Sequence, residues 1–155
     1  MRTVRFIALL IAICLPGTLP KGADEPLYDE NADARKQITD AIAEASRNGK
    51  NVVLDFGANW CGDCHVLNEQ MLKPPLSALI AKSFVVVKVD VGHMDRNLDV
   101  AEKYRVPVRH GIPALAVLDR HGTLLYAMDQ GQFADARHMS FESIKAFFEK
   151  WRPKA

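Results

Sequence analysis

The sequence predicts an α/β fold with a central mixed sheet of about four to five strands and helices on both faces. Short β-type apolar runs alternate along the chain with segments whose apolar residues recur at helical spacing. Strands separated by helices imply a partly parallel sheet that is covered on both faces. The length of 155 residues and the hydrophobic content of 48% fit one globular domain and exclude a mostly disordered chain.

Five segments carry helical periodicity or helix-boundary signals. In the first, Ile38 and Ala45 fall on one expected face, and Gly49 is a good stop. Pro74-Pro75 interrupts the chain after the segment that ends at residue 72, and Ser140 is a suitable N-cap for the segment that begins at residue 141. The expected helices are 33–47, 61–72, 76–82, 98–104 and 141–151.

Four apolar runs are typical of strands. The run over 84–91 carries the strongest signal, and His121-Gly122 between the last two runs suits a hairpin turn. The expected strands are 52–56, 84–91, 114–118 and 123–128. Residues 24–30 are expected to form a loose leader before a domain over 31–155, within which 130–138 is irregular.

The first 23 residues have the composition of a secretory signal peptide. Arg2 and Arg5 give a positive start, an apolar run follows over 6–15, and prolines and a glycine come next. At a rise of 1.5 Å per residue this run covers about half of a hydrocarbon core roughly 30 Å thick, which argues against a transmembrane anchor. We therefore expect a signal peptide over 1–23 and a periplasmic protein in an oxidising compartment, with an uncleaved N-terminal anchor as the alternative.

Charge and cysteine content narrow the classes of function. Twenty Lys and Arg against nineteen Asp and Glu give a formal net charge of +1, so no basic excess indicates nucleic acid. Three cysteines are too few for a disulfide-stapled miniprotein, and removal of residues 1–23 leaves two of them, Cys61 and Cys64. No cofactor is expected, and the chain is expected to be a monomer.

These two cysteines lie at an expected strand-to-helix corner. The run 52–56 leads through a short turn to a helix that begins near Cys61. The first amides of a helix lack an internal partner and the helix dipole adds positive charge there, so a thiolate at Cys61 is stabilised and activated. Cys64, one turn further on, is close enough to attack a mixed disulfide at Cys61. The pair is therefore expected to act as a two-electron switch.

Three other roles stay open for the cysteine pair. A structural disulfide would lie in an unusual place, at a helix start. Zinc needs about four ligands, but there is no second cysteine pair and the histidines show no paired spacing. The segment Cys61-Gly62-Asp63-Cys64-His65 also fits covalent c-type haem attachment. Against haem stands the position of the motif directly after a buried strand, where haem would displace core.

Several short motifs, in order along the chain, resemble the thioredoxin-like protein-disulfide oxidoreductases. The resemblance covers most of the chain after the expected signal. The break at Pro74-Pro75 is more similar to exported domains, such as the C-terminal domain of the inner-membrane thiol-disulfide electron transporter, than to cytosolic thioredoxin. The matching residues are Asp55-Phe56-x-Ala58-x-Trp60-Cys61-x-x-Cys64, Lys88-Val89-Asp90, Tyr104, Gly111-Ile112-Pro113 and the turn at Gly122.

The resemblance implies a role for each matching residue of the site. Cys61 would be the attacking thiol and Cys64 the resolving thiol of a redox-active disulfide. Pro113 would be a cis-proline against that disulfide, with the backbone of Ile112 free to pair with a substrate strand.

Three further side chains would support this pair. Asp55 would be a buried carboxylate that takes the proton of Cys64, with Lys88 as its neighbour on the next strand. Trp60 would cover one side of the attacking thiol and contribute to substrate binding.

The sequence departs from thioredoxin in two places near the site. Gly62-Asp63 replaces the Gly-Pro of thioredoxin, and Asp63 should disfavour the thiolate, while a protonated His65 could offset it. The stretch 106–110 lengthens the approach to Pro113.

The expected function is an exported disulfide reductase or exchange enzyme that acts on protein substrates with disulfides and takes electrons from a membrane donor. The alternative is a binding or chaperone-like module that uses a groove near Trp60 and Ile112, with redox activity secondary.

Overall fold

A computed structural model describes residues 26–154 of the chain. The expected signal peptide or anchor over 1–23 lies outside these residues. Within 26–154, no helix is both long enough and apolar enough to cross a membrane.

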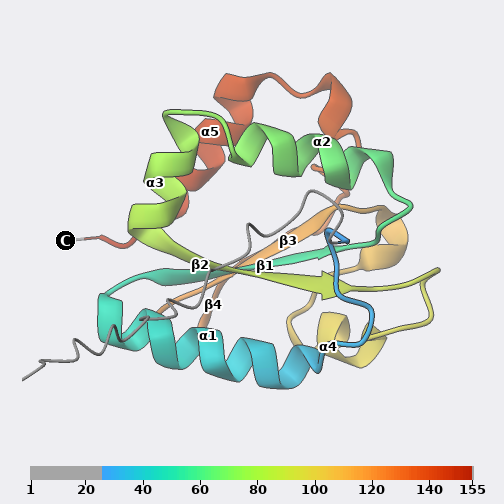
Figure 1. The fold of residues 1–155 in the computed structure, drawn as a ribbon, viewed down its shortest axis with the longest axis horizontal. Coiled ribbons are helices and arrows are strands. Elements are labelled where there is room, and N and C mark those ends of the chain that lie inside the picture. Colours follow the sequence, from blue (N-terminus) through green and yellow to red (C-terminus); the bar gives the residue numbers. More distant parts are fainter. Residues whose placement is uncertain (1–25, 155) are drawn as a thin grey trace, which may run out of the picture.

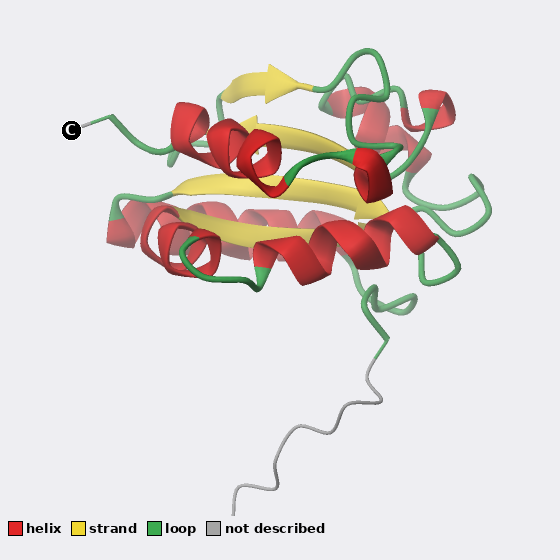
Figure 2. Cartoon of the chain, turned by 90° about the horizontal axis from the view of Figure 1, so that it is seen from above, coloured by secondary structure: helices red, strands yellow, loops and turns green. Residues whose placement is uncertain are grey.

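The centre of the fold is a four-stranded mixed sheet, as the sequence predicts. The strands lie in the order β2-β1-β3-β4, with β1 parallel to β2 and antiparallel to β3, and with β3 antiparallel to β4. Figure 2 looks onto the strands lying side by side. Their bounds are β1 Asn51–Gly57, β2 Phe84–Asp90, β3 Ala114–Leu118 and β4 Leu124–Ala127.

Helices cover both faces of this sheet. Figure 1 shows α1 and α4 on one face and α2, α3 and α5 on the other. The five predicted helices all form, and each end lies within one residue of its predicted place. Their bounds are α1 Ala34–Asn48, α2 Gly62–Met71, α3 Leu76–Ser83, α4 Leu98–Lys103 and α5 Phe141–Trp151, and two short 3-10 helices are added, η1 Val108–His110 and η2 Ala136–His138.

Side-chain caps fix the helix boundaries. Asp33 accepts a hydrogen bond of 3.0 Å from the amide of Lys36 at the start of α1. Ser140 accepts one of 3.1 Å from the amide of Ser143 at the start of α5. Such caps typically stabilise a helix by about 1 kcal/mol. Gly49 ends α1 with a φ of 67°, in the left-handed region that glycine adopts without steric cost.

The segment before α1 differs from the expected loose leader. Tyr28 is fully buried, and Leu27 packs against the same core. The side chain of Asn59 makes two hydrogen bonds of 2.9 Å to the backbone of Tyr28. Asn59 Oδ1 accepts from the Tyr28 N–H, and Asn59 Nδ2 donates to the Tyr28 carbonyl. Residues 26–30 are therefore part of the packed domain. A single tyrosine in a polar stretch gives no periodic signal, so the pattern did not indicate its burial.

Strand β1 connects this core to the candidate site. Every residue of β1 is buried, because the strand lies between β2 and β3 and is covered by helices on both sides. A strand held in this way fixes the position of the turn that follows Gly57, and with it the start of α2.

Candidate functional site

The two cysteines lie at the start of α2 and are joined as a disulfide. Cys61 is the N-cap residue, and its Sγ accepts a hydrogen bond of 3.2 Å from the amide of Cys64. Cys64 is fully buried, and Cys61 is only 4% exposed. The sulfur of Cys61 therefore lies among the free amides of the first helical turn, where a negative charge is stabilised.

The loop before β3 lies against the disulfide. Cys61 Sγ is 3.5 Å from the carbonyl oxygen of Ile112, and the peptide bond between Ile112 and Pro113 is cis. Pro113 is buried. Within residues 26–154 the N–H of Ile112 makes no hydrogen bond, so it can donate to a carbonyl of an added strand.

Trp60 is the exposed aromatic residue beside the disulfide. Its side chain is 55% exposed, although it is fixed on one side by a hydrogen bond of 2.9 Å from Nε1 to the carbonyl of Gly92. Its ring stacks on His93 with centroids 5.5 Å apart. This arrangement leaves one face of a rigid aromatic ring next to Cys61 for contact with a partner.

Asp55 and Lys88 form an ion pair in the sheet, near the end of β1 that leads to the disulfide. The two residues are register partners on parallel strands β1 and β2. Asp55 is fully buried, and Lys88 Nζ donates to its Oδ2 at 2.6 Å, with 21% of the lysine side chain exposed. Asp55 therefore lies in the interior of the sheet and does not face solvent.

Tyr28 is the second partner of Asp55. Its hydroxyl donates to Asp55 Oδ1 at 3.0 Å, and the Lys88 ammonium lies 5.4 Å from the centre of its ring. Burial, and then the negative charge of Asp55, raise the pKa of the Tyr28 hydroxyl far above its ordinary value. The hydroxyl is thus held neutral as a donor.

The charge of Asp63 is balanced by Arg137 from the irregular stretch. η2 packs against α2, and the Arg137 guanidinium and backbone amide donate to the Asp63 carboxylate at 2.7–3.2 Å. The hydrogen bonds from Arg137 hold the pKa of Asp63 below its ordinary range, and the same pair raises the pKa of Arg137. His65 instead bonds the carbonyl of Asn59 at 2.7 Å, so the partner of Asp63 is Arg137.

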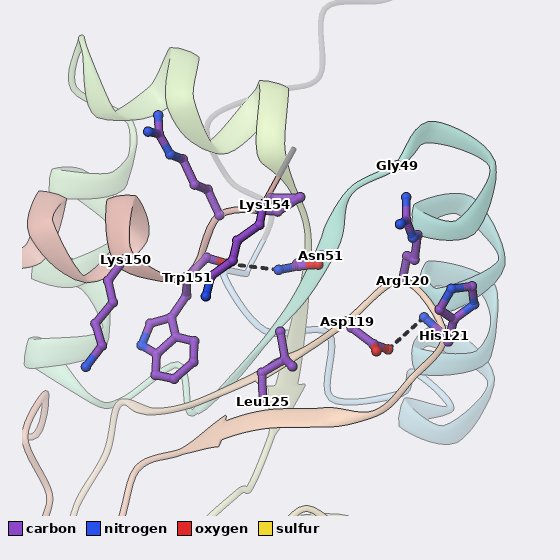
Figure 3. A pocket seen from close by; sticks show the side chains of 11 residues that line it. Gly49, Asn51, Asp119, Arg120, His121, Leu125, Lys150, Trp151 and Lys154 are labelled. Atoms are coloured by element: carbon purple, nitrogen blue, oxygen red, sulfur yellow. Dashed lines mark hydrogen bonds between the residues drawn. The ribbon is translucent and has the colours of Figure 1, made fainter.

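Metal binding and a second pocket are separate from the disulfide site. Among residues 26–154, no three His, Cys, Asp or Glu side chains come close enough together to hold a metal ion. A pocket of about 580 Å³ opens at the first residue of β1, the opposite end from the disulfide (Figure 3). Its basic lining residues are Arg120, His121, Lys150, Arg152 and Lys154.

The structure brings together all the site residues that the sequence predicts. Cys61 and Cys64 meet the loop of Ile112 and Pro113, Trp60 flanks them, and Asp55 pairs with Lys88 on the neighbouring strands. Sequence reasoning assigned no role to the residues that the structure adds, which are Tyr28, Asn59 and Arg137. Their partners lie 27, 31 and 74 residues away along the chain, a separation at which one sequence shows no pairing signal.

Comparison with known proteins decides the family. A family model described as thioredoxin-like matches residues 33–120, more than half of the chain. The crystal structure of a disulphide isomerase from Xylella fastidiosa Temecula1 is 44% identical, with a TM-score of 0.78, and the match covers 83% of this chain and 98% of that one. The chain belongs to the thioredoxin-like family.

Other relatives agree with this thioredoxin-like assignment. A thioredoxin from Echinococcus granulosus is 42% identical over 74 residues, which are 46% of this chain and 62% of the relative. The chain spans between 48% and 64% of the length of the first curated thioredoxins that it matches. The oxidised C-terminal domain of DsbD from Neisseria meningitidis shares the fold, with a TM-score of 0.57 at 18% identity over 78% of this chain and 97% of that one.

Proposed function

We propose that the protein is an exported protein thiol-disulfide oxidoreductase, a reductase or exchange enzyme that acts through its Cys-Gly-Asp-Cys dithiol. The observation that carries the proposal is the Cys61–Cys64 disulfide at the start of α2, with Cys61 Sγ 3.5 Å from the Ile112 carbonyl. A structural clamp does not need a free strand-pairing amide beside it, whereas an exchange site does. Membership of the thioredoxin-like family and the 44% identical disulphide isomerase support it.

The first step uses the helix start and the Ile112 loop. A client segment pairs with the free N–H of Ile112 and rests against Trp60, which places a client disulfide at Cys61. The Cys61 thiolate, stabilised by the amides of α2, attacks one client sulfur. A mixed disulfide forms, and the other client sulfur leaves as a thiolate that takes up a proton.

The second step releases the reduced client. Cys64 loses its proton and its sulfur attacks Cys61 Sγ, which restores the Cys61–Cys64 disulfide and frees the client thiolate. Asp55, fully buried and held by Lys88, is the group that receives the proton. Two electrons have moved from the enzyme dithiol to the client disulfide.

A reductase in an oxidising compartment needs a source of electrons. The partners we propose are therefore protein substrates with disulfides and a membrane electron donor that reduces Cys61–Cys64 again. A thiol:disulfide interchange protein DsbD 1 of Pseudomonas aeruginosa, 32% identical over 62 residues, supports this choice. We propose further that the chain works as a monomer.

Export is proposed from residues 1–23 and is tested separately. Residues 1–30 are fused to an alkaline phosphatase that lacks its own signal and is active only after export. Phosphatase activity is expected for this fusion, and an inactive fusion overturns the periplasmic location. A fusion in which residues 6–15 are replaced by polar residues is the control.

Reduction of insulin by dithiothreitol tests the redox activity. The wild-type chain should accelerate it, Cys61→Ser should abolish the acceleration, and Cys64→Ser should instead accumulate mixed disulfides through Cys61. An inactive wild-type protein, or a Cys64→Ser variant that traps nothing, contradicts the proposal. If Cys61→Ser still prevents aggregation of unfolded chains at the wild-type level, the binding or chaperone-like module is favoured. Haem absorbance in the purified protein would indicate c-type attachment instead.

A further inference from the structure

The proposed proton acceptor Asp55 has two partners, and neither is a cysteine. Lys88 donates to its Oδ2 at 2.6 Å, and Tyr28 donates to its Oδ1 at 3.0 Å. Cys64 carries no thiol proton in this disulfide state, and each Asp55 oxygen accepts from one of these two side chains. A partner of Asp55 that also lies near Cys64 is therefore the candidate to carry the Cys64 proton to this carboxylate in the reduced enzyme.

The Tyr28 hydroxyl lies where such a group is needed. A Cβ placed on Gly57 would overlap this hydroxyl and would also lie 2.9 Å from Cys64 Sγ. The hydroxyl and the sulfur thus flank the same point at the end of β1. Because the hydroxyl donates its own proton to Asp55, its oxygen lone pairs are available to a donor on the other side.

We propose that Tyr28 is a catalytic residue of the second step, which passes the Cys64 proton to Asp55. The Cys64 thiol proton moves to the Tyr28 oxygen while the Tyr28 proton moves to Asp55 Oδ1. The Cys64 sulfur, now a thiolate, attacks Cys61 Sγ of the mixed disulfide, and the client sulfur leaves with the bonding pair. The inference rests on the proposed oxidoreductase function and assigns it a residue from outside the matched family segment 33–120.

The surroundings of Tyr28 favour a hydroxyl that takes up one proton as it gives up another, and they disfavour a tyrosinate anion. Asp55 and Asp90 place negative charge near the hydroxyl, and Lys88 is the cation close to the ring. Full burial of Tyr28 excludes bulk water as a competing carrier at this point. Both backbone hydrogen bonds to Asn59, which lies in the turn before Cys61, hold the tyrosine in register with the disulfide.

The two steps are separated by reaction of the reduced enzyme with dithiobis(nitrobenzoate). The first thionitrobenzoate is released when Cys61 attacks and the second when Cys64 resolves. Tyr28→Phe keeps the ring and removes only the hydroxyl. We expect the second phase to slow about a hundredfold near neutral pH, the lower end of the range for a lost general base, with the first phase unchanged. The defect should vanish towards pH values above the ordinary thiol pKa of about 8.5, where hydroxide deprotonates Cys64 directly.

Tyr126→Phe is the matched control. The Tyr126 ring packs on Phe147 and Trp151, away from the disulfide, so neither phase should change in this variant. Asp55→Asn should slow the second phase, and adding Tyr28→Phe to it should have no further effect, because both act on one proton.

Three results for Tyr28→Phe would overturn the inference. The first is an unchanged second phase. The others are equal slowing of both phases and a defect of the same size at every pH, each of which would indicate a structural role. If Tyr28→Phe does not fold, the wild-type protein decides: a second-phase rate that depends linearly on the deuterium fraction of the solvent excludes two protons in motion. A wild-type protein that releases no thionitrobenzoate refutes the oxidoreductase function itself, which is a separate outcome.

Discussion

Asn59→Ala tests whether the segment before α1 is held by the turn that precedes the disulfide. The Asn59 side chain makes two hydrogen bonds of 2.9 Å to the backbone of Tyr28 and a weaker one of 3.2 Å to the exposed Glu30 carboxylate. Alanine removes all three and leaves the N–H and carbonyl of Tyr28 without protein partners.

The expected cost follows from these contacts. A typical hydrogen bond contributes about 0.5–1.5 kcal/mol net, so the two bonds to Tyr28 together contribute about 1–3 kcal/mol, and the exposed bond to Glu30 adds little. The loss falls on the segment that carries Tyr28. Its local opening should therefore become roughly five to a hundred times more frequent, since 1.4 kcal/mol is a factor of ten.

Hydrogen exchange at the Tyr28 amide measures this opening directly, because that amide donates to Asn59 Oδ1. Its exchange should accelerate by the same factor, and the urea midpoint should fall by on the order of 1 M if the segment opens with the whole domain. The matched control is Asn68→Ala in α2, where alanine is the better helix former, so exchange at Tyr28 should not change. An Asn59→Ala protein whose Tyr28 amide exchanges at the wild-type rate would show that packing of the ring alone holds the segment.

Two further predictions concern charge and packing. Arg137→Ala should remove stability near neutral pH and much less near about pH 2, because the lowered pKa of Asp63 gives a contribution that is fully present above the ordinary carboxyl pKa and is lost only as pH falls through the lower folded-state pKa. Urea titrations at both pH values measure this, and an equal loss at each would contradict it. The same variant should slow attack by Cys61 on the order of two- to fivefold, with Arg109→Ala as the control. Phe148→Ala should cost about 3–5 kcal/mol, because this side chain is fully buried against Phe84 and Phe147, and a smaller loss in chemical denaturation would show that the core collapses around it.

The elements of the fold follow from local signals in the sequence. β1 and β2 are rich in apolar residues because most of their side chains are buried, with Asp55 and Lys88 as the charged pair between them. The caps at Asp33 and Ser140 act within three residues. The position of Cys61 at a helix start is also local, since a strand, a turn and a helix succeed one another within the same short segment. Interactions of this range leave a pattern in a single sequence.

The partners of Asp55 and Asp63 could not be predicted in the same way. Tyr28 reaches Asp55 across 27 residues and Arg137 reaches Asp63 across 74, and both pairings depend on how the chain closes in three dimensions. A polar stretch with one tyrosine resembles a leader, and an irregular stretch with one arginine resembles a solvated loop. The packing of η2 on α2, and of residues 26–30 on β1, is what distinguishes these segments from a solvated loop and a loose leader.

The place of Tyr28 has a practical consequence for recombinant work. The match to the family model begins at residue 33, so a fragment trimmed to that residue omits the tyrosine while keeping both cysteines, the proline loop and the ion pair. Such a fragment would leave a void beside Asp55 and admit solvent to it. Rates and potentials measured on it would describe a carboxylate in contact with water, so expression boundaries for this protein belong upstream of Tyr28.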